Sequence, residues 1–210
     1  MKLVLASNNA KKLAELQALL SDLPIELLGQ GTLGIGEAEE PHVTFVENAL
    51  AKARHAARSS GLAAIADDSG LCVDALGGAP GVQSAVYAGS VATTGEREAQ
   101  RRAQDAANNA LLLARMRGVV DDRRARFVST LVAVRHADDP EPLMAIGRWE
   151  ARLLDAPRGA GGFGYDPLVW IESLAASVAE LSPAQKNGVS HRALAAAQMR
   201  DLMRAAWSLK

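Results

Sequence analysis

The sequence predicts an α/β fold with a mixed sheet and two lobes around a cleft. Short apolar runs alternate with helical patterns in the first half of the chain, which is typical of parallel strands joined by helices. In the second half, strand-like runs follow one another around a short polar turn, which indicates antiparallel pairs. A length of 210 residues with 49% hydrophobic residues allows a single domain, 1–210, with a sizeable core.

The first strand is expected at residues 3–6, where an apolar run begins close to the first residue. A polar turn at residues 7–9 leads into a helix over 10–20, whose leucines repeat at helical spacing. The backbone N–H groups at such a helix start can bind an anion, and Lys11 and Lys12 lie in its first turn. A helix capped by Ser or Asn, with two solvated lysines, explains the same residues, so both interpretations stay open at this point.

A second strand is expected at residues 25–28, followed by a glycine-rich loop over 29–36. Acidic residues, Glu39 and Glu40 among them, then precede Pro41; they form either a solvated face or a second source of metal-ligating carboxylates. Thr44 begins a capping box that opens a long helix to about residue 60.

The segment at residues 65–73 carries the chemically most distinctive residues of the chain. An apolar strand leads to two adjacent carboxylates, Asp67 and Asp68, and a second apolar run with Cys72, expected to be a buried thiol, follows Gly70. Adjacent carboxylates repel unless one is protonated or a cation lies between them, and Mg²⁺ prefers such oxygen ligands. Taken alone, residues 67–70 also fit an ordinary acidic turn.

The second half of the chain adds strands, a hairpin turn and a second glycine-rich segment that contains aromatic residues. Aromatic rings in such a segment are expected to stack on another group rather than to face water. The expected elements are a helix over 93–116 with solvated arginines, strands over 126–135 and 143–154 joined by a turn at 138–142, the glycine-rich segment 158–167, a strand over 168–171 and a helix over 193–208.

Composition and absent motifs exclude several classes of protein. The near-neutral balance of 23 Lys+Arg against 24 Asp+Glu argues against nonspecific binding to nucleic acid or to an anionic membrane. No segment approaches a membrane span and the apolar start is too short for a signal peptide, so we expect a cytoplasmic protein. The sequence contains no GxxxxGK[ST] and no GxGxxG after a strand, which argues against a P-loop enzyme and a Rossmann dehydrogenase.

Three features could share the cleft: an anion-binding turn, a carboxylate patch, and an aromatic glycine-rich loop followed by a basic segment. An anion site with carboxylates and Mg²⁺ is typical of phosphoryl chemistry, and an aromatic ring suits stacking on a nucleobase. The residues alone therefore predict a Mg²⁺-dependent nucleotide hydrolase or nucleotide-binding protein.

Five short motifs, in order and across nearly the whole chain, resemble the inosine triphosphate pyrophosphatase family. That family hydrolyses non-standard purine nucleoside triphosphates such as dITP, ITP and XTP. The matching segments are SNNAKK at 7–12, TFVENA at 44–49, ADDSGL with GGAPG at 66–71 and 77–81, FGYDP at 163–167, and SHR at 190–192.

The resemblance implies an elongated mixed α/β body with a nucleotide-binding cleft between two lobes, a homodimer, and a role for each motif. Asp68 would be the general base and a Mg²⁺ ligand, with Glu39 or Glu40 as the second carboxylate. Lys12 would be the cation that holds the triphosphate, and Phe163 would stack on the base. The substrate-binding residues would be Ser7, Asn8, Asn9, Ala10, Lys11, Lys12, Ser69, Phe163, Gly164, Tyr165, Asp166, Lys186, His191 and Arg192.

The chain departs from the family pattern at Val86, Ala151 and Ala193, none of which touches the metal carboxylates. Two alternatives are weighed against this family. One is a Maf-like pyrophosphatase acting on modified pyrimidine or methylated guanine nucleotides, but the SPRR-type segment of that family is absent. The other is a non-catalytic nucleotide sensor, against which the two aspartates argue, because a binder needs no water-activating carboxylate.

Overall fold

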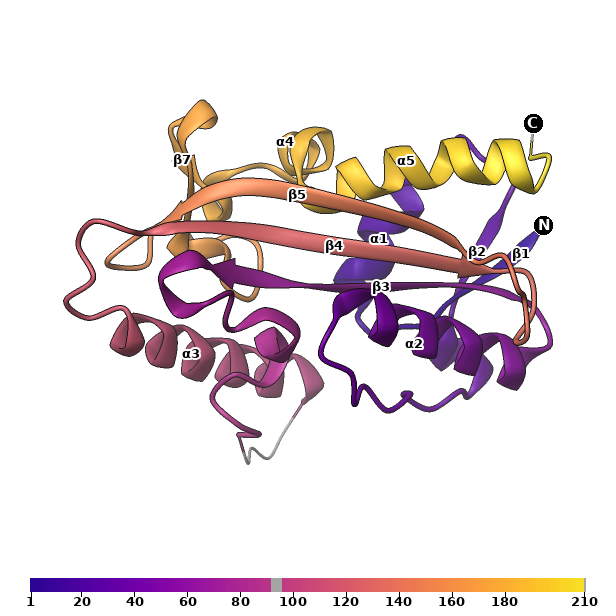
Figure 1. Cartoon of the computed structure of the whole chain (residues 1–210), viewed down its shortest axis with the longest axis horizontal. Helices are drawn as coiled ribbons and strands as arrows, with labels where there is room; N and C mark the ends of the chain where they lie inside the picture. Colours follow the sequence, from indigo (N-terminus) through magenta and orange to yellow (C-terminus); the bar gives the residue numbers. More distant parts are fainter. Residues whose placement is uncertain (92–95, 210) are drawn as a thin grey trace. The chain divides into compact units, whose positions relative to one another are not determined.

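The computed structural model describes residues 1–91 and 96–209 (Figure 1). Its strands form a seven-stranded sheet in the order β2-β1-β3-β4-β5-β6-β7. β1 pairs in parallel with β2 and β3, whereas β6 pairs antiparallel with β5 and β7, so the predicted mixed sheet is confirmed. The strands are β1 Lys2–Leu5, β2 Glu26–Gly29, β3 Ala63–Val73, β4 Arg124–Val134, β5 Leu143–Leu153, β6 Val169–Ile171 and β7 Ala176–Ser177.

The helices begin and end close to the residues that the sequence predicts. Thr44 caps α2 by accepting a hydrogen bond from the Glu47 N–H, and Gly61 ends it in the left-handed conformation. Of the helix predicted over 93–116, residues 93–95 lie outside the described residues. The helices are α1 Ala10–Leu19, α2 Phe45–Ser60, α3 Arg97–Arg115, α4 Pro183–Val189 and α5 His191–Ala206.

The chain divides into two compact units. Unit 1 comprises residues 1–69, 129–148 and 189–210, and unit 2 comprises residues 70–128 and 149–188. In unit 1, leucines of α1 and small residues of α5 pack with Leu3, Leu5 and Ile65, while the alanines of α2 pack with Val4 and Ala64. Because alternate residues of a strand point to opposite faces, α1 and α5 cover one face of this part of the sheet and α2 covers the other.

Unit 2 has its own core, built between α3 and the strands. Leu112 of α3 and Met116, which directly follows the helix, are buried with Leu71, Phe127 and other apolar residues. Cys72 is buried, as predicted for a structural thiol. The apolar side of α3 therefore packs on the core of unit 2. Its polar side chains are left to contact the loops of the same unit.

The turn interpretation of residues 67–70 is wrong. β3 continues from Ala63 to Val73 through both aspartates. A Cβ on Gly70 would lie 2.4 Å from the carbonyl oxygen of Gly81 and from Ser84 Oγ, so this glycine allows a close approach rather than a turn. Ser84 Oγ accepts a hydrogen bond of 2.9 Å from the Leu71 N–H, which supports the strand just beyond the glycine.

Two features at the C-terminal end differ from the sequence expectation. The short helix α4 was not predicted, and α5 begins at His191 rather than at 193. Ser190 caps α5 by accepting a hydrogen bond from the Ala193 N–H at 3.2 Å, so Arg192 belongs to the first turn of a helix. This cap therefore fixes the position of His191 and Arg192 at the start of α5.

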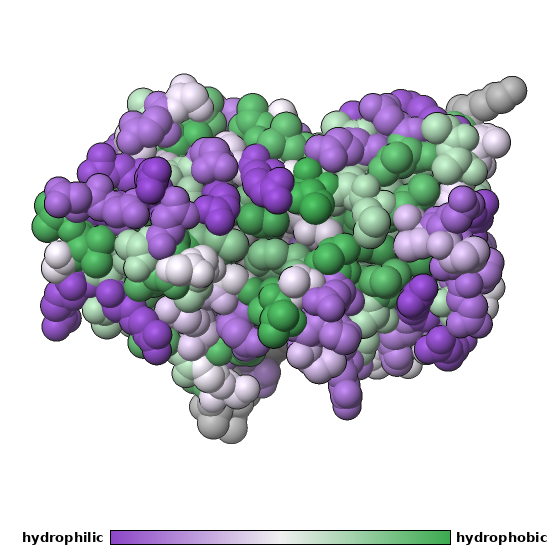
Figure 2. All heavy atoms as spheres, viewed as in Figure 1, coloured by the Kyte–Doolittle hydropathy of each residue, from purple (hydrophilic) through white to green (hydrophobic). Residues whose placement is uncertain are grey.

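The surface carries both polar and apolar residues. On the face drawn in Figure 2, hydrophilic and hydrophobic residues are interspersed. Exposed large apolar side chains such as Val43 and Val120 are far apart in sequence, and such single exposures are ordinary in folded proteins. Within the described part of the chain, the helices are all too short or too polar to cross a membrane.

Candidate active site

Asp67 lies in the middle of β3 at the centre of a buried polar network in unit 1. Its Oδ1 accepts a hydrogen bond from Ser129 Oγ at 2.8 Å. Its Oδ2 accepts hydrogen bonds from Arg192 Nε at 3.0 Å, from Arg192 Nη2 at 2.8 Å and from Ser69 Oγ at 3.2 Å. Lys12 Nζ lies 3.1 Å from the same oxygen. Burial raises the pKa of Asp67, but Arg192, Lys12 and Ser129 outweigh it and hold this pKa far below its usual value.

Asp68 has different surroundings because adjacent strand residues point to opposite faces of a sheet. Its Oδ1 accepts a hydrogen bond of 2.7 Å from Lys52 Nζ of α2. Its Oδ2 is buried and, among the described residues, has no hydrogen-bond partner. Burial raises the pKa of Asp68 to about 6, and the Lys52 ammonium offsets this only in part.

Lys52 is a functional candidate that the sequence analysis missed. It lies in the alanine-rich buried face of α2 with Asn48 and Ala53, and its side chain is 10% exposed. Its Nζ donates to Asp68 Oδ1, to Glu40 Oε2 at 2.9 Å and to the carbonyl oxygen of Asp67 at 3.3 Å. Burial lowers the pKa of Lys52, but Asp68 and Glu40 raise it further, so the ammonium form is retained.

The two acidic residues predicted near the metal differ in their contacts. Glu40 shares Lys52 with Asp68 and is 45% exposed, so its carboxylate lies at the edge of the cluster. Glu39 is exposed. Of these two glutamates, Glu40 is therefore the one connected to Asp68, through the Lys52 ammonium that both carboxylates contact.

These side chains fit a magnesium ion that is shared with a substrate. The buried Asp68 Oδ2, with no donor from the described residues, is a hard oxygen ligand, and Glu40 offers a second carboxylate nearby. Within residues 1–91 and 96–209, no group of three or more His, Cys, Asp or Glu side chains is arranged to hold a metal ion. Because Mg²⁺ is commonly held by one or two carboxylates plus substrate phosphates, a nucleotide would complete the set of ligands.

At the predicted phosphate-binding turn, the helix cap and the lysines both have defined partners. Asn9 Oδ1 accepts hydrogen bonds from the Lys11 and Lys12 N–H groups at 3.0 and 3.2 Å, and Ser7 Oγ accepts one from the Asn9 N–H. Asn8 Nδ2 donates to Glu37. The capping interpretation of Asn9 is therefore confirmed, but Lys12 is not a solvated lysine, because its side chain is 17% exposed and faces Asp67. Burial lowers the pKa of Lys12, and Asp67 opposes that change.

Arg192 is 1% exposed, so its guanidinium serves the interior of unit 1. Besides Asp67, it contacts Ser69 Oγ at 3.1 Å and forms an ion pair with Glu15 of α1. Its neighbour His191 is buried at the start of α5. Arg192 thus ties α1, β3 and α5 together behind the two aspartates.

Unit 2 brings together three of the residues predicted to bind the substrate. Lys186 Nζ lies 2.9 Å from Asp166 Oδ2 and 4.4 Å from the centre of the Phe163 ring. Asp166 Oδ2 also accepts a hydrogen bond from the Phe163 N–H at 3.0 Å. The charged pair and the ring therefore form one compact group.

Tyr165, predicted to bind substrate, lies in the core of unit 2. It is 5% exposed, and its hydroxyl donates to the carbonyl oxygen of Ser84 at 2.9 Å. Burial raises the pKa of Tyr165. This position gives Tyr165 a packing role below the loop.

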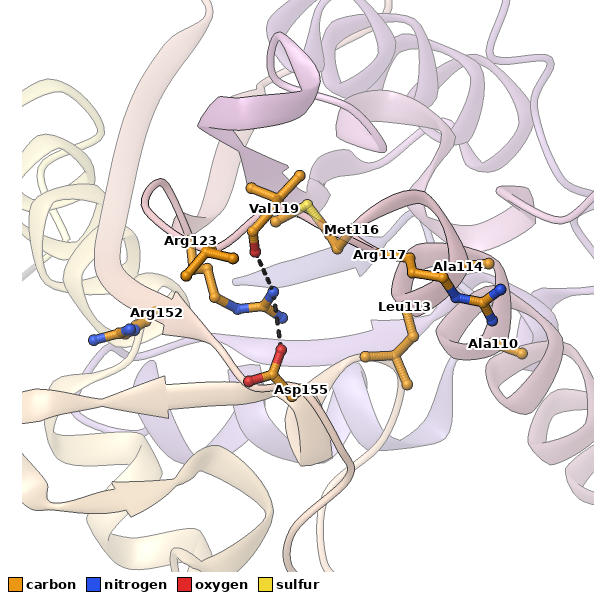
Figure 3. Close-up of a pocket in the computed structure, with 11 residues that line it drawn as sticks. Ala110, Leu113, Ala114, Met116, Arg117, Val119, Arg123, Arg152 and Asp155 are labelled. Atoms are coloured by element: carbon orange, nitrogen blue, oxygen red, sulfur yellow. Dashed lines mark hydrogen bonds and ion pairs between the residues drawn. The ribbon is translucent and has the colours of Figure 1, made fainter.

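A hollow of about 540 Å³ in unit 2 contains none of the predicted site residues. Figure 3 shows Arg123 at its edge, where the guanidinium donates to the carbonyl oxygen of Val119 and pairs with Asp155. Arg123 also donates to the carbonyl oxygens of Leu153 and Leu154, so its donors serve to hold the backbone. The residues that line this hollow therefore include none of the carboxylate cluster or the aromatic cluster.

These two clusters define a class of protein, a hydrolase or binding protein for a phosphorylated, aromatic ligand. The model of the Ham1 family matches residues 3–202, and the chain belongs to that family. The chain is 69% identical over 207 residues to the dITP/XTP pyrophosphatase of Methylibium petroleiphilum, covering 99% of each chain. It is 66% identical to the dITP/XTP pyrophosphatase of Leptothrix cholodnii over the full length of both.

Solved structures give the same result. A HAM1 protein from Coxiella burnetii superimposes with a TM-score of 0.86 at 42% identity, covering 98% of this chain and 99% of that chain. The Ham1 protein of Staphylococcus aureus gives a TM-score of 0.82 at 33% identity, covering 98% of this chain and 100% of that one. The resemblance seen in the motifs is confirmed, and the Maf-like alternative is not supported.

Proposed function

We propose that this protein hydrolyses dITP, ITP and XTP, which are non-standard purine nucleoside triphosphates, to the monophosphate and pyrophosphate. The observation that carries the proposal is the buried Asp68 Oδ2, a carboxylate oxygen with no donor from the described residues. Full-length relatives at 69% and 66% identity that are named dITP/XTP pyrophosphatase support it.

In the proposed reaction, Asp68 Oδ2 accepts a proton from a water molecule. Burial raises the pKa of Asp68 above its usual value, which favours proton acceptance from water. The water oxygen bonds to the α-phosphorus, the bond from this phosphorus to its bridging oxygen breaks, and pyrophosphate leaves. Asp67 stays ionised within its network, and Lys12 and Lys52 provide cationic donors beside the two carboxylates.

Asp68 and Glu40 would hold a magnesium ion in this site. Bound Mg²⁺ would neutralise charge on the phosphate oxygens. The homodimer implied by the family resemblance and the cytoplasmic location expected from the sequence both stay predictions.

The proposed base selectivity depends on hydrogen-bond donors. Phe163 would stack on the purine, and Lys186 beside it is a donor suited to a 6-oxo group. Adenine presents a 6-amino group instead, which would leave a donor unpaired at a cost of roughly 1–3 kcal/mol. The site therefore favours hypoxanthine and xanthine over adenine.

The test is to measure pyrophosphate and orthophosphate separately from ITP, dITP, XTP, ATP, GTP and dTTP, with Mg²⁺ or with a chelator. We predict pyrophosphate from ITP, dITP and XTP with Mg²⁺, at a kcat/KM roughly 100-fold above that for ATP. Orthophosphate as the product, or equal rates for ATP and ITP, would contradict the proposal. Binding of ITP without product would instead support the nucleotide sensor.

A further inference from the structure

Helix α3 presents polar side chains one turn apart to the loops of unit 2. Asp105 Oδ2 accepts a hydrogen bond of 2.8 Å from the Gly164 N–H. Asn109 Nδ2 donates one of 3.0 Å to the Gly164 carbonyl oxygen. Residues four apart on a helix lie on the same face, so this pair holds both backbone polar groups of a single residue.

Hydrogen bonds to the backbone of Gly164 restrict the conformation of the neighbouring residue Phe163. The φ of +61° at Gly164 is left-handed, a conformation that side chains rarely adopt, and the Gly164 N–H belongs to the peptide that begins at Phe163. Fixing the N–H orients the peptide plane before Gly164, and fixing the carbonyl orients the plane after it. On the far side, the Phe163 N–H is held by Asp166 Oδ2. The backbone of Phe163 is thus fixed on both sides.

We propose that Asp105 and Asn109 are positioning residues that set the orientation of the Phe163 ring and thereby the affinity for the base. The inference rests on the proposed function, in which Phe163 stacks on the purine. Both side chains reach the loop through their hydrogen bonds to the Gly164 backbone, next to the Phe163–Asp166–Lys186 group. An aromatic ring stacks well only over a narrow range of orientations, so a released Gly164 weakens binding without changing the reacting groups.

The test compares Asp105→Ala and Asn109→Asp with the wild type in steady-state turnover of ITP. Asn109→Asp keeps the size of the side chain but replaces the donor to Gly164 with an acceptor. We predict that each raises KM by about tenfold, as expected for one lost hydrogen bond that orders a loop, with kcat within about twofold. Asp105→Asn keeps an oxygen acceptor for the Gly164 N–H and should stay close to the wild-type KM.

Gln104→Ala is the matched control. Gln104 lies on the same helix and also holds a backbone loop, through the Gly89 carbonyl oxygen at 2.8 Å and the Val91 N–H at 3.0 Å. Its side-chain hydrogen bonds go to Gly89, Val91 and Asn108, so its loss should leave the KM for ITP unchanged. An equal rise in KM for Gln104→Ala would show a general effect of α3 and would overturn the inference.

A double-mutant cycle with Phe163→Ala tests the route of the effect. If Asp105 acts through the ring, adding Asp105→Ala to Phe163→Ala should raise KM no further. A full additional tenfold rise would overturn the inference. Wild-type protein that releases no pyrophosphate from any nucleotide would refute the proposed function, whereas an active wild type with unchanged KM in folded Asp105→Ala and Asn109→Asp would refute only this inference.

Discussion

Two neighbouring aspartates on one strand have opposite electrostatic surroundings. Asp67 accepts hydrogen bonds from Arg192, Ser129 and Ser69, whereas Asp68 receives one from Lys52. A fully paired buried carboxylate is part of the structure, while a partly paired one retains an oxygen for chemistry. We therefore propose that Asp67 supports the site and that Asp68 is the reactive group.

This difference predicts that the same substitution has unequal effects on stability at the two positions. Asp67→Asn leaves the buried Arg192 and Lys12 without a full counter-charge and should lower the free energy of unfolding by about 3–5 kcal/mol. Asp68→Asn removes a buried carboxylate with one unsatisfied oxygen and should leave this free energy within about 1 kcal/mol of the wild type. Urea denaturation of the two variants checks this. Equal losses in the free energy of unfolding would show that the two aspartates contribute equally to stability, which would contradict this prediction.

At the level of elements, the start of α5 is placed by a glycine on β5. A Cβ on Gly147 would lie 1.9 Å from the carbonyl oxygen of His191 and 2.7 Å from the Ala195 N. Both contacts are with the backbone of α5, which cannot move aside as a flexible side chain would. The close approach places Arg192 within reach of Asp67.

Gly147→Ala should therefore lower the free energy of unfolding by about 1–3 kcal/mol and reduce turnover, because α5 is displaced. Gly188→Ala is the matched control: a Cβ there would meet nothing within 4 Å, and alanine favours the helix. Thermal unfolding of both variants gives the comparison. If Gly147→Ala melted with the wild type, α5 would not depend on this contact.

Local sequence signals predicted the elements whose stability is local. The cap at Thr44 and the glycine at Gly61 located α2, and the alternation of strands and helices gave the sheet class. β3 was predicted to end early because residues 67–70 are turn formers, but contacts with Ser84, Ser129 and Arg192, distant in sequence, keep it extended. At these residues, tertiary contacts outweigh the local turn propensity.

The site was only partly predictable for the same reason. Asp68 and Lys12 follow from short motifs, and the structure places Lys12 against Asp67. Lys52 could not be found, because a lysine among helix-forming residues looks solvated and its partner lies 16 positions away. Asp105 and Asn109 could not be predicted for the same reason. They lie in a polar helix, and their contacts with Gly164 form only in the folded chain.

At the scale of the whole molecule, the chain assigns different chemistry to its two units. Unit 1 carries the carboxylates with Lys12 and Lys52, which suit a metal ion and phosphates. Unit 2 carries Phe163 with Lys186, which suit a base.

The central claim is that Asp68 activates the water that cleaves the nucleotide. The most direct measurement is the turnover of dITP by Asp68→Asn with Mg²⁺, together with its dITP affinity by calorimetry. We predict a fall in kcat of roughly 10²–10⁴-fold, the usual contribution of a general base, while the folded variant still binds dITP. Turnover within a few-fold of the wild type would contradict the assignment of Asp68.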